Sequence, residues 1–530
     1  MKRDLVRLGL FAAVLFGARL GARDLWNPNE PIYGEAVVEM ARRGDWLVPH
    51  VNGLVFAEKP ILFYWLARVA ATILGGVSEL SLRVPSLLAG IATVLGTYVL
   101  ARPYAGRERA LASGAACATL FGVFWNARFV QMDILVTATT LWTVLAIARA
   151  TDGLWSPLRG WLTAGAVAGV GFLAKGPVAW IGPALVVGAD LLATRRLRAL
   201  LRREVLAGAA LCVAIAAPWF LALWAGGHTD VIHEVLVRQN FSRFSNPWDH
   251  AAPVWYYLEY FWIDMAPWSF FVPLALAPAR AAEGERRLWR LSWLWIAAVV
   301  VFFSLSRSKR SPYILPIAPA VALLAGQVAI AFAGEALPAA RRRAAIAIAA
   351  ALAAALAIGG IGLVVVARRD HPDLATPATA LSIVALAGAS WIAATLLRGA
   401  ASRRAATPRA LVLSVAAFYL AAAVAVLPAL DAYKSARPVA EEIARIARPG
   451  DRVASFDFWS WRSEYAYYLG HPIENLAGRE ALRDAWRDAG RLVLLVEADR
   501  LGEVRSVVGE AEPGWSRTVG GKSVYLFTNR

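Results

Sequence analysis

Charged residues and cysteines are both scarce in this chain. Asp, Glu, Lys and Arg make up 18% of its 530 residues, whereas a soluble protein of this size has roughly 25%. The only cysteines, Cys117 and Cys212, stand inside apolar segments. A disulfide framework is therefore not expected, and a metal cluster of thiolates is excluded. The low charge content argues against a soluble protein.

The N-terminus also lacks a feature. It begins with basic residues and an apolar stretch, as a secretory signal peptide does, but no small-residue cleavage site follows. The apolar stretch instead continues towards a Trp-containing segment. We therefore expect a retained first helix.

Long apolar runs are what the chain has in abundance. The run "AAIAIAAALAAALAIGGIGLVVVA" (344–367) is long enough to cross about 30 Å of hydrocarbon. The net charge of +17 comes with arginines clustered in short loops, where they set membrane topology and meet anionic headgroups. We predict a polytopic α-helical membrane protein and no nucleic-acid partner.

The apolar segments predict about thirteen transmembrane helices if every basic loop is cytoplasmic. The segment 61–77 is the difficult one, because as a crossing it would move all later basic loops to the outside. As an interfacial helix anchored by Trp65 and Arg68 it keeps them inside. The thirteen segments are 5–22, 85–101, 110–130, 134–150, 161–174, 177–193, 205–224, 266–279, 289–305, 313–333, 344–367, 378–397 and 409–430.

This topology places several polar parts of the chain on one outer face. They are the loop 23–60, Asp133, Lys175, the loop 225–265 and the segment 306–313. Ionisable groups at a membrane edge are costly and are functional candidates. Each also has a plain structural explanation: Lys175 could snorkel, and the basic residues of 306–313 could bind headgroups.

The last hundred residues have a different character. Three stretches read as strands, "RVASFDFWS", "RLVLLVEAD" and "KSVYLFTN", and three as helices, "SEYAYYLG", "GREALRDAWRDAG" and "LGEVRSVVG". "VGGKS" reads as a hairpin turn rather than a phosphate-binding loop. We predict a transmembrane domain over 1–430, with a first periplasmic loop of interfacial helices at 23–84, and a small periplasmic α/β domain over 431–530.

The first loop carries a familiar pattern. "LWNPNEPIYGEAVVEMARRGDWLVPHVNGLVFAEKPILFYW" resembles the corresponding loop of bacterial lipid A aminoarabinose transferases, which belong to the polyprenyl-phosphate mannosyltransferase-like group with the GT-C fold. The likeness extends to "RVPS", "QMDILV", "LAKGP", "RFSNPWDHAAPVWYY" and "SKRSPYILP" in the same order. It implies about thirteen helices and a periplasmic C-terminal domain.

The resemblance implies an enzyme of the bacterial inner membrane that transfers a sugar from undecaprenyl phosphate to a lipid, glycan or protein acceptor at the periplasmic face. Such a donor needs cations for its phosphate and a carboxylate that assists the acceptor. The candidate phosphate or substrate ligands are Tyr33, Lys59, Asp133, Lys175, Arg243, Arg307, Lys309 and Tyr313.

Within that resemblance, Glu58 matches an essential acid of the family and Tyr313 a tyrosine near the donor phosphate. His250 matches a histidine near a bound metal, and with Glu58 it could hold a zinc-like divalent ion. Two ligands are too few for a zinc site, which needs three or four. No cofactor is therefore assigned.

The chain departs from the family at its catalytic aspartate. Asn29 occupies that position, before Glu30, and Pro31-Ile32 replaces a Thr-Arg pair, while Tyr33 and Glu35 persist. An amide cannot act as a base. Glu30 or Glu58 then does that work, or the acceptor needs little deprotonation, or activity is lost. We therefore do not assign the family's lipid A substrate to this protein.

Two alternative functions belong to other classes of protein. A transporter or flippase of lipid-linked glycans would show inverted repeats and a mid-membrane site, whereas the ionisable residues here gather at one face. A catalytically inactive homologue that acts as a binding partner is suggested directly by Asn29.

Overall fold

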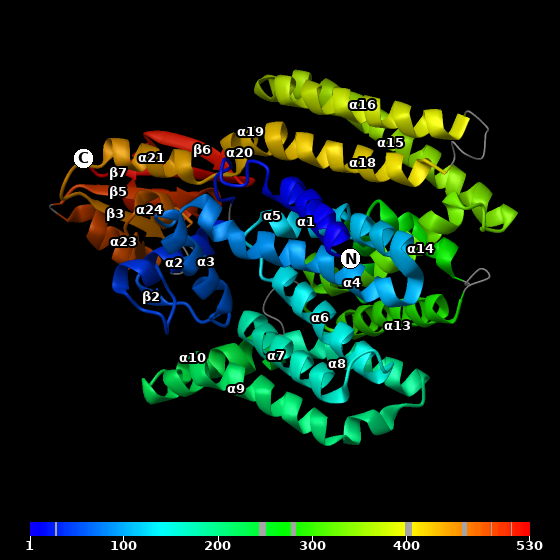
Figure 1. The fold of residues 1–530 in the computed structure, drawn as a ribbon. Helices are drawn as coiled ribbons and strands as arrows, with labels where there is room; N and C mark the ends of the chain where they lie inside the picture. The colour runs from blue at the N-terminus through cyan, green and yellow to red at the C-terminus, as the bar shows by residue number, and fades with distance from the viewer. Residues whose placement is uncertain are drawn as a thin grey trace. The chain divides into compact units, whose positions relative to one another are not determined.

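The structure is a computed structural model, and it describes residues 1–26, 29–242, 251–276, 282–397, 405–457, 464–488, 490–509 and 511–530. The chain divides into two compact units (Figure 1). The first, called the helical unit, comprises 1–20, 58–63 and 83–426. The second, called the mixed unit, comprises 21–57, 64–82 and 427–530.

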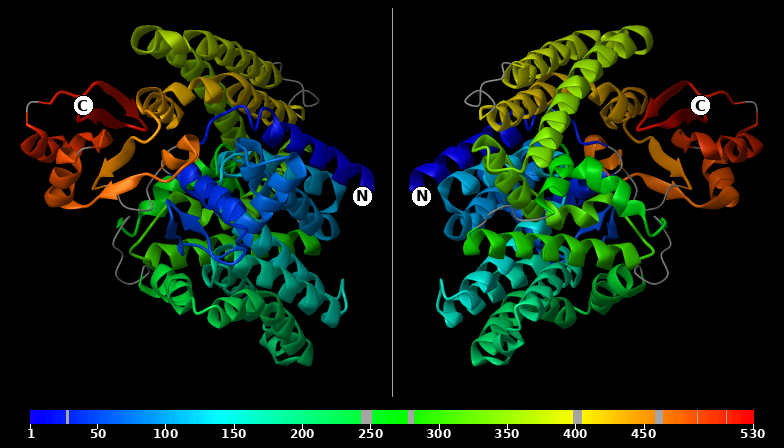
Figure 2. Two further views of the ribbon diagram at one scale, coloured as in Figure 1. Left: turned by 90° about the vertical axis from the view of Figure 1, so that its left-hand side faces the viewer. Right: turned by 90° about the vertical axis from the view of Figure 1, so that its right-hand side faces the viewer.

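The helical unit consists of α-helices joined by short 3₁₀ and π segments, written η. Helix α16 packs against both α15 and α18, and α7 packs against both α6 and α9 (Figures 1 and 2). The bounds are α1 Lys2–Gly17, α4 Glu79–Ala118, α5 Phe121–Arg128, α6 Asp133–Thr151, α7 Pro157–Lys175, α8 Val178–Ala193, η1 Leu197–Leu201, α9 Arg203–Ala225, α10 Thr229–His233, η2 Glu234–Ser242, α12 Tyr256–Asp264, η3 Trp268–Ala275, α13 Glu283–Leu305, η4 Ser311–Ile317, α14 Ala318–Ala333, α15 Ala339–Asp370, η5 Pro372–Leu374, α16 Ala375–Leu397, α18 Thr407–Ala421 and η6 Ala422–Val426.

Eight helical stretches in the described residues are long and apolar enough to cross a membrane. They are 79–118, 133–151, 203–225, 283–305, 311–333, 339–370, 372–397 and 407–429. The multi-pass prediction is thereby confirmed. The segment predicted to be interfacial forms α3, Leu62–Leu74, whose 13 residues extend only about 20 Å.

One predicted span differs from a simple helix. The segment 110–130 is divided, because α4 ends at Ala118 and α5 begins at Phe121. Contacts with η3 replace the lost helical bonds: the Phe121 amide donates to the Ala266 carbonyl at 2.9 Å, and the Trp268 indole donates to the Thr119 hydroxyl at 2.8 Å. Within α4, Gly106 adopts φ 80°, which a residue with a Cβ rarely tolerates, so the helix kinks there.

Glycines allow α7 and α9 to pack closely. A Cβ on Gly165 would lie 2.0 Å from the carbonyl oxygen of Gly208, so the two backbones are in direct contact. Small residues at such crossings are typical of helices that associate in membranes.

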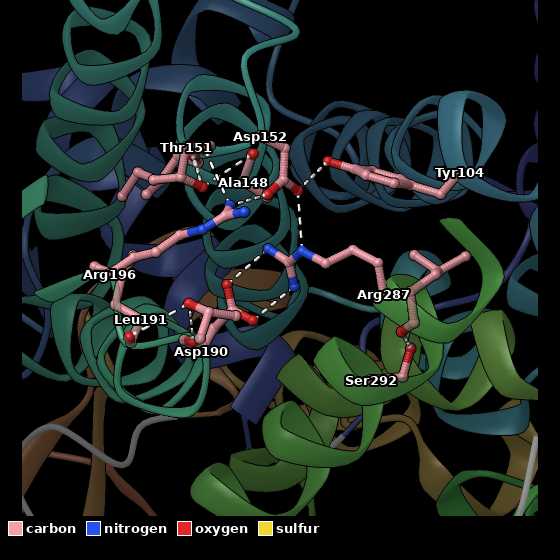
Figure 3. Close-up of polar contacts among 12 residues, drawn as sticks. Tyr104, Ala148, Thr151, Asp152, Asp190, Leu191, Arg196, Arg287 and Ser292 are labelled. Carbon is pink, nitrogen blue, oxygen red and sulfur yellow. Dashed lines mark hydrogen bonds and ion pairs between the residues drawn. The ribbon is translucent and has the colours of Figure 1, made fainter. Parts of the chain in front are cut away.

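A buried ionic cluster joins four elements of the helical unit (Figure 3). Arg287 of α13 donates two hydrogen bonds to Asp190 of α8, at 2.6 and 2.7 Å, and one to Asp152 at 3.0 Å, just after α6. Tyr104 of α4 donates to the same oxygen of Asp152 at 2.8 Å. Arg196 reaches the other oxygen of Asp152 at 2.8 Å. The cluster is called the Arg287 cluster below.

The mixed unit combines the first loop with the C-terminal residues. Arg437 pairs with Asp24 at 2.8 Å and with Glu79 at 2.7 Å, and the Trp26 indole donates to Asp431 at 2.7 Å. The elements are α2 Asn29–Arg43, β1 His50–Val51, β2 Leu54–Val55, most of α3, α19 Leu427–Ala429, α20 Asp431–Lys434, α21 Arg437–Ile446, β3 Arg452–Phe456, α22 Ala466–Leu469, β4 Glu474–Leu476, α23 Gly478–Arg487, β5 Leu492–Glu497, η7 Ala498–Arg500, α24 Leu501–Val508, β6 Trp515–Val519 and β7 Lys522–Thr528.

A five-stranded sheet in the order β4-β3-β5-β7-β6 is the centre of the C-terminal part (Figures 1 and 2). Strand β3 is parallel to its neighbours β4 and β5. Strand β7 is antiparallel to its neighbours β5 and β6. Alternate residues of β5 face opposite sides: Val493 packs with α21, and Leu494 packs with α23 and α24. The predicted strands, helices and hairpin at "VGGKS" are confirmed, whereas β4, β6 and α21 were not predicted.

Candidate active site

A cavity of about 510 Å³ opens within the helical unit. Its walls come from four stretches of chain that are far apart in sequence, 58–60, 175–181, 235–240 and 302–313, and they include both polar and apolar side chains. The lining residues are Glu58, Lys59, Pro60, Lys175, Pro177, Val178, Ile181, Val235, Gln239, Asn240, Phe302, Phe303, Ser306, Ser308 and Tyr313. Four residues named from the sequence therefore meet in one cavity: Glu58, Lys59, Lys175 and Tyr313.

Lys175 is held at the wall by two groups. Its ammonium donates a hydrogen bond to Asp133, at the start of α6, and lies 4.8 Å from the centre of the Tyr313 ring. Both partners of the ion pair are about 15% exposed. A cation over an aromatic face is attracted by the ring quadrupole. The arrangement fixes a positive charge at the cavity, as an anionic ligand requires.

Glu58 and Lys59 supply the second charged part of the wall. The Lys59 ammonium donates to the Glu58 backbone carbonyl at 3.1 Å, and lies 4.0 Å from the Glu58 carboxylate. The Glu58 side chain is 28% exposed, so its carboxylate is accessible from the cavity. A carboxylate beside a cation can accept a proton while the cation holds an anion.

The segment 306–313 contributes differently from the sequence-based expectation. Lys309 is 4% exposed, and its ammonium donates to the carbonyls of Ala252, at 3.0 Å, and Ser306. Burial lowers the pKa of Lys309. Arg307 is exposed. Neither is among the residues that line the cavity. Lys309 therefore stabilises the turn from which Ser308 and Tyr313 reach the cavity, and a phosphate contact by either basic residue stays a prediction.

Two predicted residues, Arg243 and His250, lie outside the described residues. Among those that are described, no group of three His, Cys, Asp or Glu side chains could hold a metal ion. Glu58 alone of the tentative metal pair can be placed, and its carboxylate already has Lys59 as a cationic neighbour. The described donors do not form a metal site, so no chemical step below uses a metal.

Glu30 of α2 is committed to contacts inside the mixed unit. Its carboxylate accepts from Arg23 at 2.8 and 3.1 Å and from the Trp26 amide at 3.0 Å. The side chains of Glu30 and Arg23 are 3% and 5% exposed. A buried carboxylate bonded in this way stabilises the turn that precedes α2, and this argues against Glu30 as the base. The role predicted for it is therefore less well supported than that of Glu58.

Asn29 and Tyr33 lie on the same helix. Asn29 is the first residue of α2, and Tyr33 packs at 6.0 Å from Phe56 and 6.4 Å from Tyr64, ring centre to ring centre. Both are partly exposed. Their roles in substrate binding stay predictions.

Glu35 of α2 is the most unusual acid of the mixed unit. It is fully buried, and among the described residues neither carboxylate oxygen has a hydrogen-bond partner. Burial, and the carboxylate of Glu39 one turn later, raise the pKa of Glu35 to about 7. The neutral acid is therefore the form that suits the folded protein.

We expect stability to fall as the pH rises from about 5 to about 8. The pKa of Glu35 is higher in the folded than in the unfolded chain, so its contribution is complete below about 4.5 and is lost as the pH passes through about 7. The loss is roughly 3 kcal/mol. Unfolding of the purified protein at pH 5 to 8 tests this. Glu35→Gln should flatten the profile, and an unaltered slope in that variant would disprove the assignment.

The cavity also contains residues that the sequence did not single out, above all Asn240, Ser306 and Ser308. Asn240 belongs to η2, and its side-chain amide donates to the Val235 carbonyl at 2.7 Å. The Ser306 hydroxyl donates to the Ser308 carbonyl at 3.0 Å. All three lie in segments that were predicted to face outward, 225–265 and 306–313, but short neutral residues carry no charge that would single them out within those segments.

Comparison with known proteins identifies the family of this chain. A family model described as dolichyl-phosphate-mannose-protein mannosyltransferase matches residues 58–222. An undecaprenyl phosphate-α-4-amino-4-deoxy-L-arabinose arabinosyl transferase of Pectobacterium carotovorum is 31% identical over 405 residues, 74% of this chain and 70% of the relative. The chain belongs to this arabinosyl transferase family.

Another member of the family, from Pseudomonas aeruginosa, is 33% identical over 336 residues, 62% of this chain. The aligned part spans 59% of that relative's length. The crystal structure of ArnT from Cupriavidus metallidurans bound to undecaprenyl phosphate aligns with a TM-score of 0.79 and 22% identity, over 99% of this chain and 97% of that one. At this identity the likeness establishes the fold alone, and it is the membrane-transferase fold that the family resemblance implied.

Proposed function

We propose that the protein transfers a sugar from a polyprenyl phosphate, such as undecaprenyl phosphate, to a lipid, glycan or protein acceptor. The observation that carries the proposal is the meeting of Glu58, Lys59, Lys175 and Tyr313 in one cavity. Family membership supports it, since the relatives are named for transfer from undecaprenyl phosphate. The particular sugar and acceptor are not part of the proposal.

In the proposed reaction an acceptor oxygen attacks the anomeric carbon, and the bond from that carbon to the phosphate oxygen breaks. Glu58 takes the proton of the acceptor hydroxyl, and the phosphate leaves with the electron pair of the broken bond. Lys59 and Lys175 stabilise the negative charge that collects on the leaving phosphate. An acceptor that is already anionic would need less help from Glu58, which would agree with asparagine at position 29.

The proposed setting is the periplasmic face of a bacterial inner membrane, with about thirteen crossings. The basic loops lie on the opposite side in this arrangement, as the positive-inside rule requires. In this proposal the short α3 rests at the membrane interface, and the C-terminal α/β part and the first loop, 23–84, are both periplasmic. Val178, Ile181 and Phe302 line the cavity and supply apolar surface that suits a prenyl chain.

Binding and transfer by the purified protein test this function directly. Wild type should bind undecaprenyl phosphate and should transfer sugar from a glycosylated form of it. Binding without transfer, from any polyprenyl-phosphate sugar, would favour an inactive homologue that acts as a binding partner, the alternative suggested by Asn29. Absence of binding would reject the proposal altogether.

We expect Lys59→Ala to weaken undecaprenyl phosphate binding about 10- to 100-fold, because it removes a charge-assisted hydrogen bond to phosphate. Arg307→Ala is the comparison: it deletes an exposed cation that was also predicted to bind phosphate but does not line the cavity, so its loss of affinity should be smaller. Lipid-binding titrations in detergent measure both. Equal losses in the two variants would mean that general attraction to lipid headgroups, and not the cavity, binds the phosphate.

A further inference from the structure

The Ser308 hydroxyl is buried in the cavity wall and has no hydrogen-bond partner in the described part of the chain. Ser308 is 2% exposed, and its Oγ has no hydrogen bond with any described residue. A buried hydroxyl left unpaired costs about 1–3 kcal/mol. Since the residue lines the cavity, a ligand in that cavity is the group that can complete its hydrogen bonding.

Asn240 offers a second neutral group to the same cavity. Its Nδ2 is bound to the Val235 carbonyl, which fixes the amide and leaves the Oδ1 as an acceptor. A Cβ on Gly176 would lie 3.6 Å from this Nδ2 and 3.8 Å from Pro60. Asn240 therefore stands where the turn after Lys175 meets the turn after Lys59, next to the positive part of the wall.

The amide oxygen of Asn240 distinguishes this part of the wall from a phosphate site, whereas the Ser308 hydroxyl can donate to either ligand. A fixed amide oxygen can only accept a hydrogen bond, and the oxygens of a phosphodiester ionised at neutral pH have no proton to give. A sugar offers hydroxyl or amino groups that donate to the amide oxygen, and oxygens that accept from a serine hydroxyl. Neutral groups beside a cationic wall thus suit the sugar that a lipid phosphate carries.

We propose that Ser308 and Asn240 form the sugar subsite of the cavity and bind the hydroxyl or amino groups of the transferred sugar. The inference rests on the proposed function, because it takes the ligand to be a glycosylated polyprenyl phosphate. It assigns phosphate and sugar to different residues: the charged groups of the wall bind the phosphate, and these two bind the sugar.

The experiment compares two lipids, undecaprenyl phosphate and undecaprenyl phosphate bearing whichever sugar wild type binds best among arabinose, 4-amino-4-deoxyarabinose and mannose. We expect Ser308→Ala and Asn240→Ala each to weaken binding of the glycosylated lipid about three- to tenfold, the usual loss of one neutral hydrogen bond. Affinity for undecaprenyl phosphate alone should not change.

Ser306→Ala is the matched control, because its hydroxyl lines the same cavity but already donates to the Ser308 carbonyl. It should reduce thermal stability and leave the preference for the glycosylated lipid as in wild type. Ser308→Ala should not reduce the stability of the ligand-free protein, since it removes an unpaired hydroxyl. If the Ser308 hydroxyl instead had a structural role, Ser308→Ala would lower the stability of the ligand-free protein.

The outcomes separate the two proposals. If wild type binds neither lipid, the proposed function is wrong. If wild type binds both lipids alike, or if the Ser308 and Asn240 variants lose affinity for both alike, the function survives and the sugar subsite is rejected.

Discussion

Glu58→Gln should lower the rate of sugar transfer by a factor of about 10² to 10⁴, the usual contribution of a general base. The substitution keeps the size of the side chain and removes its ability to take a proton. Lys59, which donates to the Glu58 backbone carbonyl, keeps that contact. We therefore expect affinity for undecaprenyl phosphate to stay near that of wild type while turnover falls.

Glu30→Gln provides the contrast that isolates the base. Glu30 is buried and paired with Arg23, so removal of its charge should lower thermal stability as well as activity. Glu58 is partly exposed at the cavity, and its variant should unfold at the wild-type temperature. Steady-state transfer and thermal unfolding of both variants measure the difference. Wild-type turnover in Glu58→Gln would show that the catalytic role of this acid is wrong.

The sequence was sufficient to predict the class of protein, the fold and four residues of the cavity. Apolar run length and loop charge depend on composition alone, so the multi-pass architecture could be read directly. Lys175 could be named because an ionisable group at a membrane edge is costly without a purpose. Lys59 was named as a cation for the donor phosphate, and Glu58 and Tyr313 were named through the family resemblance. The C-terminal strands were predictable because they are short apolar runs between polar residues; β5, for example, is buried at five of its six positions.

The contacts of individual side chains could not be predicted in the same way. Lys309 and Arg307 are two residues apart and equally basic, yet one is buried against backbone carbonyls and the other is exposed. Glu30 pairs with Arg23 because the chain turns between them, and no periodic pattern in the sequence predicts that turn. Ser308 and Asn240 meet a common cavity only through the packing of helices distant in sequence.

The Arg287 cluster should be the most sensitive stabilising feature of the helical unit (Figure 3). Arg287→Met would leave Asp190, 7% exposed, and Asp152, 12% exposed, without their shared cation. Removal of one partner from a buried ion pair costs about 3–5 kcal/mol. We expect a comparable loss in the stability of the purified protein, measured by unfolding in detergent.

Arg196→Met is the control within the same cluster. Arg196 also binds Asp152, but its side chain is 50% exposed, and exposed pairs contribute about 0–1 kcal/mol. The double variant Arg287→Met, Asp190→Leu should recover part of the loss, because it removes an uncompensated buried charge. Equal effects of the two arginine variants would contradict the importance assigned to burial.

Arg287→Met should also alter lipid binding in the cavity, because three helices extend from the Arg287 cluster to the cavity wall. Helix α6 begins at Asp133, the partner of Lys175, and ends beside Asp152; α8 carries Val178 at its start and Asp190 near its end. Helix α13 runs from Arg287 to Phe303 at the cavity wall. Loss of Arg287 removes the ionic contact that joins these three helices at the end away from the cavity, so we expect affinity for undecaprenyl phosphate to fall together with stability. Arg287→Met protein that is less stable but binds the lipid like wild type would show that the cluster holds the helices together without setting the geometry of the cavity.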